Sequence, residues 1–600
     1  MNLKKFFSEL KRREVYKVAI AYGITAWLIA QISGLVSTSF EFPSWVMQMI
    51  ITILIVGFPI ALILSWVFEV SSKGIKKTTP LTSDGLDEHK PMETRLVIGI
   101  LVLIGLLMVG GWWTWQKFGF DKSPPIRNLV VLPFDNYTGS DEYEYFVAGM
   151  HSSLITDIGR IGELTVKSKT TANSYKETDL SVPEIASELG IDAAVEGSIT
   201  CMGEDSVCVQ IRLVSAYPEE QQLWVQDYRV EKSQILNFYN KVTKTISNQI
   251  NIVLTPQEES QLAESRTVDR EAYDAYLKGR YYWEDLSLES LTKARDYLEN
   301  AIKVSPDWAA PYAGLAQVWV GLAQMGFESP EIAGPKIMEN IEKAIELDPD
   351  FPDSHYINGI IAVWTQWNWE KGEKEFLHAL AINPSDAMSR IYYAHLLTIL
   401  RRTDEALLHA KIAQELDPLN PLLLGLYAVV LIDAGECETA LAQIEKGLSI
   451  EPDHFFTRPK LFRAYKCLGD YEKMFEIWKQ DNYKLWEKYG ITEHIENVFR
   501  EKGWLAFQEE LIRIHEELYV EDGQLLYPEG LATKYFNIGK YDKILDIYEK
   551  MYENHNPNLP YISTRKSFNK LKNNTRYIEL LRKMKLPMPE DYQTTEDKRN

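Results

Sequence analysis

Residues 411–418 read KIAQELDP, and four phrases of the same form recur in the second half of the chain. They are NAIKVSP (300–306), KAIELDP (343–349), HALAINP (378–384) and KGLSIEP (446–452). The closing prolines stand at positions 306, 349, 384, 418 and 452, so the gaps between them are 43, 35, 34 and 34 residues. A nearly constant gap of this size indicates a stack of similar helix pairs.

Small residues recur in the same frame, where two antiparallel helices must approach each other closely. On the expected first helix they are Ala316, Gly359, Ala394 and Ala428; on the second they are Ala301, Ala344, Ala379, Ala413 and Gly447. Proline and small residues held together at a 34-residue spacing are typical of the tetratricopeptide repeat (TPR). The sequence therefore predicts an all-α TPR solenoid over residues 271–590, with an insertion near Met325–Pro335 and degenerate repeats between Asp481 and Gly530.

Stacked helix pairs form an extended concave surface, and this is where TPR proteins usually bind their partners. Seven side chains are expected to form a partner-binding groove there: Gln317, Tyr356, His395, Thr398, Phe456, Arg463 and Lys466. The alternative is that they are ordinary solvated residues of a helix face. Phe456, Arg463 and Lys466 combine an aromatic anchor with two cations on an acidic chain, which favours an acidic or C-terminal peptide segment as the ligand.

The chain of 600 residues exceeds what one hydrophobic core usually organises, so several folded units are expected. Its charge is unevenly distributed. The residues before Arg127 include 13 Lys and Arg and 9 Asp and Glu. Since the whole chain has 64 basic and 85 acidic residues, the remainder has 51 basic and 76 acidic ones. That remainder is strongly acidic and would repel a phosphate backbone, so no nucleic-acid partner is expected.

Three uncharged apolar runs stand near the N-terminus: Val18–Phe40, Phe42–Phe68 and Leu96–Gln116. Each has at least 21 residues, enough to cross about 30 Å of hydrocarbon as a helix. A signal peptide followed by core helices is the alternative, but the first run is long for a cleaved segment and no A-x-A-like site follows it. The sequence predicts a basic head at residues 1–17 and three transmembrane α-helices within residues 18–116.

Basic residues set the expected orientation, because Lys and Arg resist translocation. Six of them precede the first run, none lies in the turn Ser37–Trp45, and five lie between the second and third runs. The N-terminus and the second loop are therefore expected in the cytoplasm, and everything after Gln116 outside it. For a Gram-negative bacterium, this predicts a multi-pass protein of the cytoplasmic membrane with periplasmic C-terminal domains.

From Asn128 the apolar pattern changes to short β-branched runs separated by amphipathic stretches, which indicates a small α/β domain over residues 127–254. Strands are expected at Leu129–Leu132, Leu164–Lys167, Ala193–Ile199, Val207–Val214 and Leu223–Tyr228. Helices are expected at Phe146–Ile158, Val182–Leu189 and Ile235–Val253.

Four segments of this domain carry a resemblance: VVLPFDNYTGSDEYEYFVAGM (130–150), ELTVKSKTTANSYK (163–176), EIASELGIDAAVEGSI (184–199) and QLWVQDYRV (222–230). In this order they resemble the TolB amino-terminal-like (FlgO-like) domain, which in bacterial membrane sensors commonly sits between a transmembrane segment and TPR repeats. Relatives among cyclase- and CadC-type sensors carry an output domain ahead of the membrane. Only about fifteen residues precede the first apolar run here, too few for such a domain. The resemblance implies a recognition or structural role.

Cys201 and Cys208 flank Gly203-Glu204-Asp205-Ser206, which has the composition of a hairpin turn. The spacing is compatible with a disulfide across paired strands in an oxidising compartment and with two unpaired cysteines, and the disulfide is slightly favoured. Cys437 and Cys467 lie in another domain, so the four cysteines do not fit a two-plus-two zinc site.

No catalytic pattern is visible in the sequence: H-E-x-x-H, P-loop, G-x-S-x-G and G-x-G-x-x-G are all absent. The sequence therefore predicts no enzyme activity, no cofactor and no metal. The predicted function is a membrane-anchored scaffold or sensor-like protein that binds protein or peptide partners outside the cytoplasm. The alternative is an accessory or degenerate member of a cyclase- or CadC-like signalling system.

Overall fold

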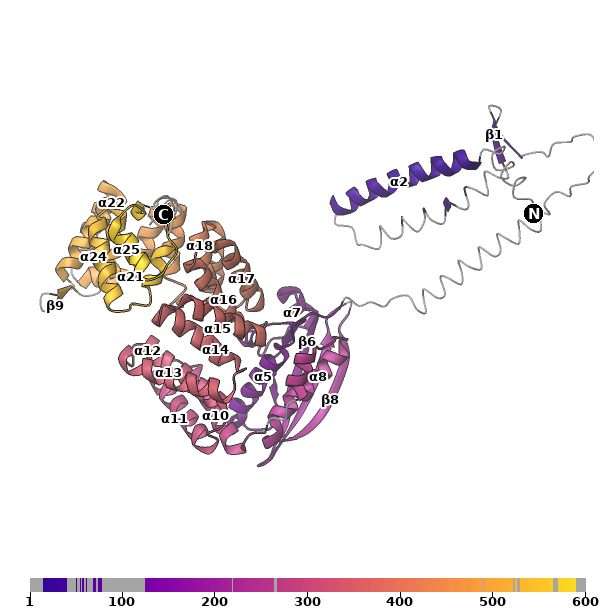
Figure 1. The fold of residues 1–600 in the computed structure, drawn as a ribbon, viewed down its shortest axis with the longest axis horizontal. Coiled ribbons are helices and arrows are strands. Elements are labelled where there is room, and N and C mark those ends of the chain that lie inside the picture. Colours follow the sequence, from indigo (N-terminus) through magenta and orange to yellow (C-terminus); the bar gives the residue numbers. More distant parts are fainter. Residues whose placement is uncertain are drawn as a thin grey trace, which may run out of the picture. The chain divides into compact units, whose positions relative to one another are not determined.

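In a computed structural model the chain divides into two compact units, Met1–Phe120 and Asp121–Asn600. Figure 1 shows their elements. The structure describes residues 15–39, 68–71, 74–77, 125–217, 219–263, 267–488, 490–518, 520–521, 524–525, 529–564 and 570–589, with single residues between 50 and 61.

The first unit contains one long apolar helix, α2 (Val15–Ser39), and a hairpin of β1 (Phe68–Ser71) and β2 (Gly74–Lys77). The 19 residues Val15–Ser33 are long and apolar enough to cross a membrane. Length and composition suit a membrane anchor and a signal sequence alike.

The prediction of three transmembrane helices is wrong. In the part of the chain that the structure describes, α2 is the single helix of sufficient length and apolarity. The run Phe42–Phe68 lies largely outside the described residues, and its last residue begins strand β1; the run Leu96–Gln116 lies wholly outside them. An apolar run shows that a segment is hydrophobic. Hydrophobicity alone does not require the segment to form one continuous helix over its whole length.

The α/β part of the second unit is built on one mixed sheet with strand order β5-β3-β6-β7-β8, in which β4 also pairs with β6. The strands are β3 (Asn128–Val131), β4 (Asp135–Asn136), β5 (Thr165–Val166), β6 (Ala193–Met202), β7 (Ser206–Ser215) and β8 (Gln221–Glu231). Strand β3 runs parallel to β5 and β6, whereas β6, β7 and β8 form an antiparallel meander. Each of the five predicted strands overlaps one of these.

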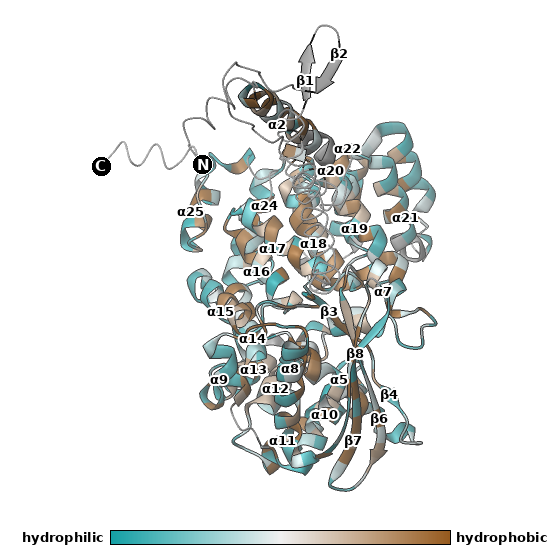
Figure 2. Ribbon diagram, turned by 90° about the vertical axis from the view of Figure 1, so that its right-hand side faces the viewer, coloured by the Kyte–Doolittle hydropathy of each residue, from teal (hydrophilic) through white to brown (hydrophobic). Residues whose placement is uncertain are grey.

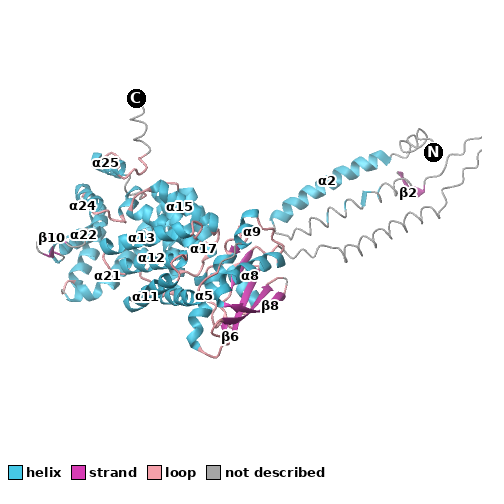
Figure 3. Ribbon diagram, turned by 60° about the horizontal axis from the view of Figure 1, so that its bottom comes forward, coloured by secondary structure: helices cyan, strands magenta, loops and turns pink. Residues whose placement is uncertain are grey.

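Alternation along β3 sends neighbouring side chains to opposite faces of the sheet. Leu129 and Val131 pack in one core with α5 (Glu144–Ile158) and α8 (Ile235–Gln249). Val130, between them, packs in another core with residues of α6 (Lys169–Asn173) and α7 (Val182–Leu189). Helices therefore cover both faces, and Figure 3 shows the long strands of this unit gathered beside α5 and α8. Short 3-10 turns η1 (Asp141–Tyr143) and η2 (Lys232–Gln234) precede α5 and α8.

The rest of the second unit is helical and begins with α9 (Pro256–Ala263). Paired helices follow: α10 (Arg270–Trp283) with α11 (Leu288–Val304), α12 (Ala309–Gln324) with α13 (Pro330–Leu347), α14 (Pro352–Ile360) with α15 (Trp369–Ile382), α16 (Ala387–Ile399) with α17 (Thr403–Leu416), and α18 (Pro421–Ala434) with α19 (Cys437–Ile450). A π turn, η3 (Ile361–Thr365), extends α14. Less regular elements complete the chain: α20 (Lys460–Leu468), α21 (Tyr471–Lys488), α22 (Thr492–Leu518), β9 (Val520–Glu521), β10 (Gln524–Leu525), α23 (Glu529–Asn537), α24 (Tyr541–Glu553), η4 (Leu559–Ser563) and α25 (Thr575–Lys583).

Each repeated phrase ends the second helix of its pair in the same way. The residue before the proline has a φ between −131° and −142°, because proline disfavours the helical region for its predecessor. Its backbone N–H donates to the carbonyl of the small residue four positions earlier, as from Asn383 to Ala379. The phrase is therefore a helix stop that also keeps the last turn hydrogen-bonded.

The small residues permit the predicted close approach of the paired helices. Ala344, Ala379 and Ala413 are fully buried. At Gly359 an added Cβ would lie 2.9 Å from the ring of Phe376, closer than real contacts allow. Helix α18 is almost wholly apolar and most of its residues are buried, and Figure 2 shows it in brown within the helical array. Its 14 residues make it a core helix too short to span a membrane.

The turns that end α15 and α17 fix the repeats to the α/β domain. Ser385 Oγ donates to the Leu164 carbonyl at 3.2 Å and accepts from the Val166 N–H at 3.1 Å. Thr171 Oγ1 donates to Asp417 Oδ1 at 2.8 Å, and burial raises the pKa of that carboxyl. The α/β domain and the middle of the solenoid thus share a polar interface.

The C-terminal helices fold back onto the repeats. Trp369 Nε1 donates to the Met584 carbonyl at 2.8 Å, and Ser563 Oγ donates to the Ile399 carbonyl at 2.7 Å. Arg401 Nε donates to the Ser563 carbonyl at 2.8 Å. As a result, the chain's own C-terminal segment packs against the helices of the repeats.

Candidate functional site

A cavity of about 570 Å³ lies between the repeats and the C-terminal helices, and we call it the groove cavity. One wall comes from α14, η3, α16, α18 and α20, with Gln324 at the end of α12. The other wall comes from α23, α24 and η4 with the turn before it. This volume lies within the range of about 300–1,000 Å³ that is usual for ligand pockets.

His395 on α16 links the two walls. Its Nε2 lies 3.1 Å from the carbonyl oxygen of Leu426, which can only accept, so Nε2 carries the proton. Nδ1 therefore accepts from the Tyr561 hydroxyl at 2.9 Å. Burial lowers the pKa of His395 to about 4, and the nearby cations Arg463 and Lys460 act in the same direction. The imidazole is neutral at pH 7 and acts as a structural link between the walls.

Two cations on α20 project into the groove cavity. Lys460, the first residue of the helix, places its ammonium 3.9 Å from the centre of the Phe456 ring. Burial lowers the pKa of Lys460 to about 8, and the neighbouring Arg463 acts in the same direction. Arg463 Nη2 lies 3.5 Å from Oδ1 of Asp433, whose side chain is almost fully buried.

Aromatic side chains form much of the repeat wall. Trp364 lies in the π turn η3, which breaks the regular advance of α14 at the point where the cavity begins. Its ring meets that of Tyr392 edge-on, with centroids 5.5 Å apart. Tyr392 also packs against Tyr356 at 5.7 Å. π turns within helices are frequent at functional sites.

The structure brings three of the seven predicted groove residues together: His395, Phe456 and Arg463 line the groove cavity. The other four lie outside its lining. Gln317 accepts from Arg280 Nη1 at 2.7 Å, Tyr356 packs behind Tyr392, and the Thr398 hydroxyl donates to the Ala394 carbonyl within its own helix. Lys466 lies further along α20.

Sequence reasoning missed Lys460, Trp364, Tyr392 and Tyr561. The usual repeat frame places Phe456 on the first helix of its pair, whereas residues 453–459 form turns and α20 begins only at Lys460. Thr457, buried in these turns, donates to the Pro421 carbonyl at 2.6 Å. The longer connection between α19 and α20 delays the start of the helix but leaves its frame unchanged. Lys460 lies 34 residues after Leu426 and 68 after Tyr392, and all three line the cavity. The repeat period could therefore have identified Tyr392 and Lys460. No local signal identifies Tyr561, which reaches the cavity from η4.

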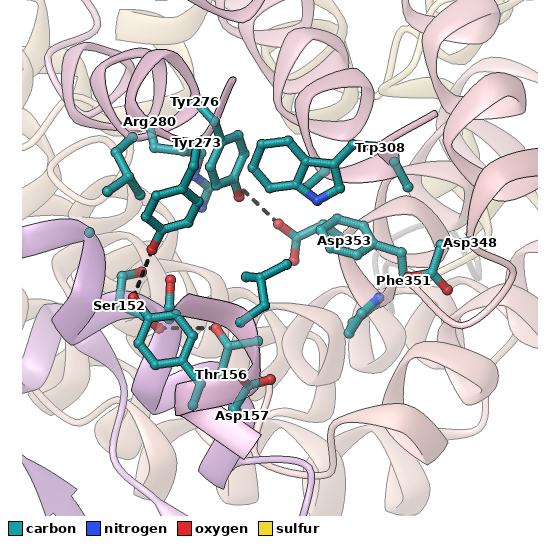
Figure 4. Close-up of a pocket in the computed structure, with 18 of the residues that line it drawn as sticks. Ser152, Thr156, Asp157, Tyr273, Tyr276, Arg280, Trp308, Asp348, Phe351 and Asp353 are labelled. Atoms are coloured by element: carbon teal, nitrogen blue, oxygen red, sulfur yellow. Dashed lines mark hydrogen bonds and ion pairs between the residues drawn. The ribbon is translucent and has the colours of Figure 1, made fainter. Parts of the chain in front are cut away.

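A second cavity, of about 590 Å³, lies between α5 and the first repeats (Figure 4). Tyr273, Tyr276 and Trp308 form an aromatic wall, in which the Tyr276 and Trp308 rings are 4.9 Å apart. Arg280 Nη1 lies 3.3 Å from Asp353 Oδ2 across this cavity. Six carboxylates and three cations line it. The carboxylates are those of Asp157, Glu284, Asp307, Asp348, Asp350 and Asp353.

His151 lies on α5 but outside both cavities. Its Nε2 is 2.8 Å from the Val131 carbonyl oxygen, and burial lowers its pKa to about 4. Among the residues that the structure describes, no group of three or more His, Cys, Asp or Glu side chains is placed to hold a metal ion.

The structure pairs Cys201 with Cys208 across β6 and β7, and Cys437 with Cys467 between α19 and α20. The first pair is the one considered from the sequence. The second joins residues 30 positions apart, and the sequence offered no reason to connect them.

Comparisons with known proteins place these features in context. No protein-family profile matches the chain. The chain is 25% identical over 266 residues to a Rhizobium meliloti protein named "Putative adenylate cyclase 3", covering 42% of this chain and 45% of that protein. It is 24% identical over 307 residues to the transcriptional regulator HilA of Salmonella typhimurium, covering 49% and 52%. The chain thus spans about half the length of the curated relatives it matches.

Solved structures similar to this chain include other repeat proteins. The TPR protein TTC0263 of Thermus thermophilus aligns with a TM-score of 0.27 and 19% identity, over 33% of this chain and 98% of that one.

Proposed function

We propose that this chain is a non-enzymatic, membrane-anchored scaffold or sensor-like protein that binds an extracytoplasmic polypeptide through its TPR repeats. The groove cavity is the observation that carries the proposal. It lies on the face that TPR proteins usually use for binding, and it combines aromatic walls with a few polar groups. Aromatic and arginine side chains at the centre of a concave surface are the residues that dominate most protein interfaces.

Anchoring is assigned to α2. Lys4, Lys5, Lys11, Arg12 and Arg13 precede this helix and would hold its N-terminal end in the cytoplasm. A single crossing then carries the rest of the chain to the other side of the bacterial cytoplasmic membrane. The arrangement needs no further span.

The partner class follows from charge. The chain carries a net charge of −21, which disfavours a nucleic acid and favours a polypeptide that can present apolar side chains. We further assign residues 127–254 to the TolB amino-terminal-like (FlgO-like) type of domain. The support is the order of its four motifs and the matching order of strands and helices.

A signalling role is the second candidate, and the two curated relatives favour it. One carries the name of an adenylate cyclase and the other that of a transcriptional regulator. Each is matched over about half its length by a chain in which no catalytic motif is visible, so we infer that the matched parts serve recognition. In that case this chain would be an accessory member of such a system.

Site-specific photocrosslinking in cells tests the proposal. A photoreactive amino acid at Thr533, which lines the groove cavity, should form an adduct with a polypeptide partner. The same amino acid at Leu408, which is 58% exposed and lies outside the lining, is the matched control. The adduct at Thr533 should disappear when Phe456 and Arg463 are both replaced by Ala. Equal adducts from both positions, or none from Thr533, would contradict the proposal.

A further inference from the structure

The groove cavity differs in charge from the chain that builds it. Lys460 and Arg463 line it, and none of the described residues in its lining is Asp or Glu. The protein as a whole carries 85 acidic against 64 basic side chains, and the cavity beside α5 is lined by twice as many carboxylates as cations. Two cations without a carboxylate in the same lining indicate a site that is complementary to a negative group.

The positive charges of Lys460 and Arg463 are compensated differently. Arg463 lies 3.5 Å from the buried carboxylate of Asp433, which compensates its charge from outside the lining. Lys460 faces the Phe456 ring at 3.9 Å, and in the described part of the chain it forms no ion pair within 4.0 Å. A cation removed from water in this way is stabilised by an incoming anion more than an exposed lysine would be.

The other residues that line the cavity indicate which chemical groups the ligand carries next to its anionic group. Trp364, Tyr392 and Val429 offer aromatic and apolar surface, while Thr533 and Asn558 offer polar side chains on the opposite wall. A free inorganic anion would leave the apolar surface unused. A carboxylate attached to an apolar or aromatic residue would use both parts.

The C-terminal segment limits how much of a ligand can enter. Tyr561 and Ile562 of η4 line the cavity, and Ser563 is held by its hydrogen bonds to Ile399 and Arg401. The cavity is therefore bounded by the chain itself on the side opposite the repeats. A volume of about 570 Å³ suits one or two residues of a peptide better than a long extended segment.

We propose that the groove cavity is a carboxylate-binding site in which the Lys460 ammonium forms an ion pair with a peptide carboxylate, while an adjoining apolar side chain packs against Trp364 and Tyr392. The inference rests on the proposed polypeptide-binding function and names the group that such a ligand presents. The carboxylate comes from a peptide C-terminus or from an acidic side chain, and these two sources share the same chemistry at Lys460.

Three small probes separate the sources in calorimetric titrations of the purified full-length chain. N-acetyl-phenylalanine presents a terminal carboxylate, N-acetyl-Glu-Phe-amide presents a side-chain carboxylate, and N-acetyl-Gln-Phe-amide is neutral. At least one carboxylate probe should bind at least about tenfold more tightly than the neutral probe, a difference of about 1.4 kcal/mol. The probe that shows this preference identifies the source.

Substitutions on α20 tie the preference to one residue. Lys460→Met should abolish the preference, whereas Lys460→Arg should keep most of it because the charge is retained. Lys466→Met makes the same change on the same helix outside the cavity lining and should leave the preference unchanged. Circular dichroism confirms that each variant remains folded.

Equal binding of charged and neutral probes, failure of both carboxylate probes to bind, or an unchanged preference in folded Lys460→Met would each overturn the carboxylate site. The crosslink from Thr533 does not depend on the charge of the ligand. A crosslinked partner together with no carboxylate preference would therefore overturn this inference and leave the proposed function standing.

Discussion

The Tyr561 hydroxyl lies 2.9 Å from Nδ1 of His395, although 166 residues separate the two side chains in the sequence. This hydrogen bond joins η4 to α16 at the edge of the groove cavity. Because Nε2 of the same ring is occupied by the Leu426 carbonyl, the imidazole has both nitrogens satisfied inside the protein. The C-terminal segment is thus attached to the repeats at the site where we expect a ligand.

Tyr561→Phe should loosen that attachment. The substitution removes the hydroxyl but keeps the ring, so Nδ1 of His395 becomes a buried acceptor without its donor, at a cost of about 1–3 kcal/mol. Thermal unfolding and hydrogen exchange of residues 559–563 should both report the change. Tyr312→Phe removes a hydroxyl that donates to the Pro306 carbonyl at the exposed surface and should cost under about 0.5 kcal/mol. Equal effects of the two substitutions would contradict the linking role of His395.

Acid should destabilise the protein through His151 and His395, two of its buried histidines. His151 and His395 have pKa values near 4 in the folded chain, against about 6.5 when unfolded. Between these values the unfolded state binds more protons, so stability falls as the pH falls through this window. From pH 7 to pH 5 each histidine should contribute a loss of about 2 kcal/mol.

Denaturant unfolding of wild type and His395→Gln at pH 7 and pH 5 measures this effect. The variant should be less stable at pH 7 yet lose less stability between the two pH values. An identical pH dependence in the two proteins would show that His395 does not titrate as described.

Much of the helical array could be predicted because its signals are local. A proline moves the residue before it out of the helical backbone region. A small residue four positions before that residue lets the partner helix approach. Both therefore recur in the sequence at the repeat period. The strands of the α/β domain were predictable for a similar reason, since the unbroken apolar run Leu129–Val131 is typical of a strand whose two faces are both buried.

The candidate site was predicted only in part, and the residues that were missed are of two kinds. Tyr392 and Lys460 lie 34 residues before and after Leu426, so the repeat period could have identified both. The others depend on irregular or distant elements. Tyr561 arrives from a segment that lacks the repeat signature, through contacts more than 150 residues apart. The prediction of three membrane helices was wrong for a different reason. Apolar runs are a strong local signal, but that signal does not determine how many continuous helices form.

Gly359 should be intolerant of even one added methyl group. Its Cβ would lie 2.9–3.0 Å from three atoms of the Phe376 ring, which is fully buried and has no space to move into. Gly359→Ala should therefore destabilise the repeats by about 1–3 kcal/mol through overpacking. At Gly334, also within a helix, no atom outside its chain neighbours lies within 4 Å of the added Cβ. Pro335 follows and disfavours a helical residue with a Cβ before it, which offsets the helix propensity that alanine gains, so Gly334→Ala should change stability by less than about 1 kcal/mol. Thermal unfolding midpoints of the two variants should move in different directions or at least by clearly different amounts.

The cysteine pairs report the compartment of the folded chain. Cys201–Cys208 and Cys437–Cys467 should be oxidised if the second unit lies outside the cytoplasm, where disulfides persist. Thiol labelling of denatured, unreduced protein taken directly from cells should then modify no cysteine, while a reduced sample should label all four. Full labelling without reduction would remove both disulfides and the extracytoplasmic location together. Labelling of Cys201 and Cys208 alone would remove only the hairpin bond.

Binding of a carboxylate probe should weaken as the pH rises past about 8. Lys460 is the group expected to titrate there, since burial and Arg463 lower its pKa to about 8 from the ordinary 10.5. The titratable groups that line the cavity with it are Arg463, His395, Tyr392, Tyr548 and Tyr561. Arg463 stays charged and His395 stays neutral across this range, and burial raises the pKa of Tyr392 and Tyr561.

Deprotonation removes the charge that attracts the ligand, so affinity at pH 9.5 should be at least about fivefold lower than at pH 7, because little more than a few per cent of Lys460 remains protonated. Lys460→Arg should abolish this dependence, since the guanidinium does not titrate below about pH 12. Calorimetry with the same probe at about pH 7, 8 and 9.5 measures it, with the neutral probe as the control for changes in the cavity itself. A pH dependence that survives in Lys460→Arg would assign the titration to another group and separate the carboxylate preference from Lys460.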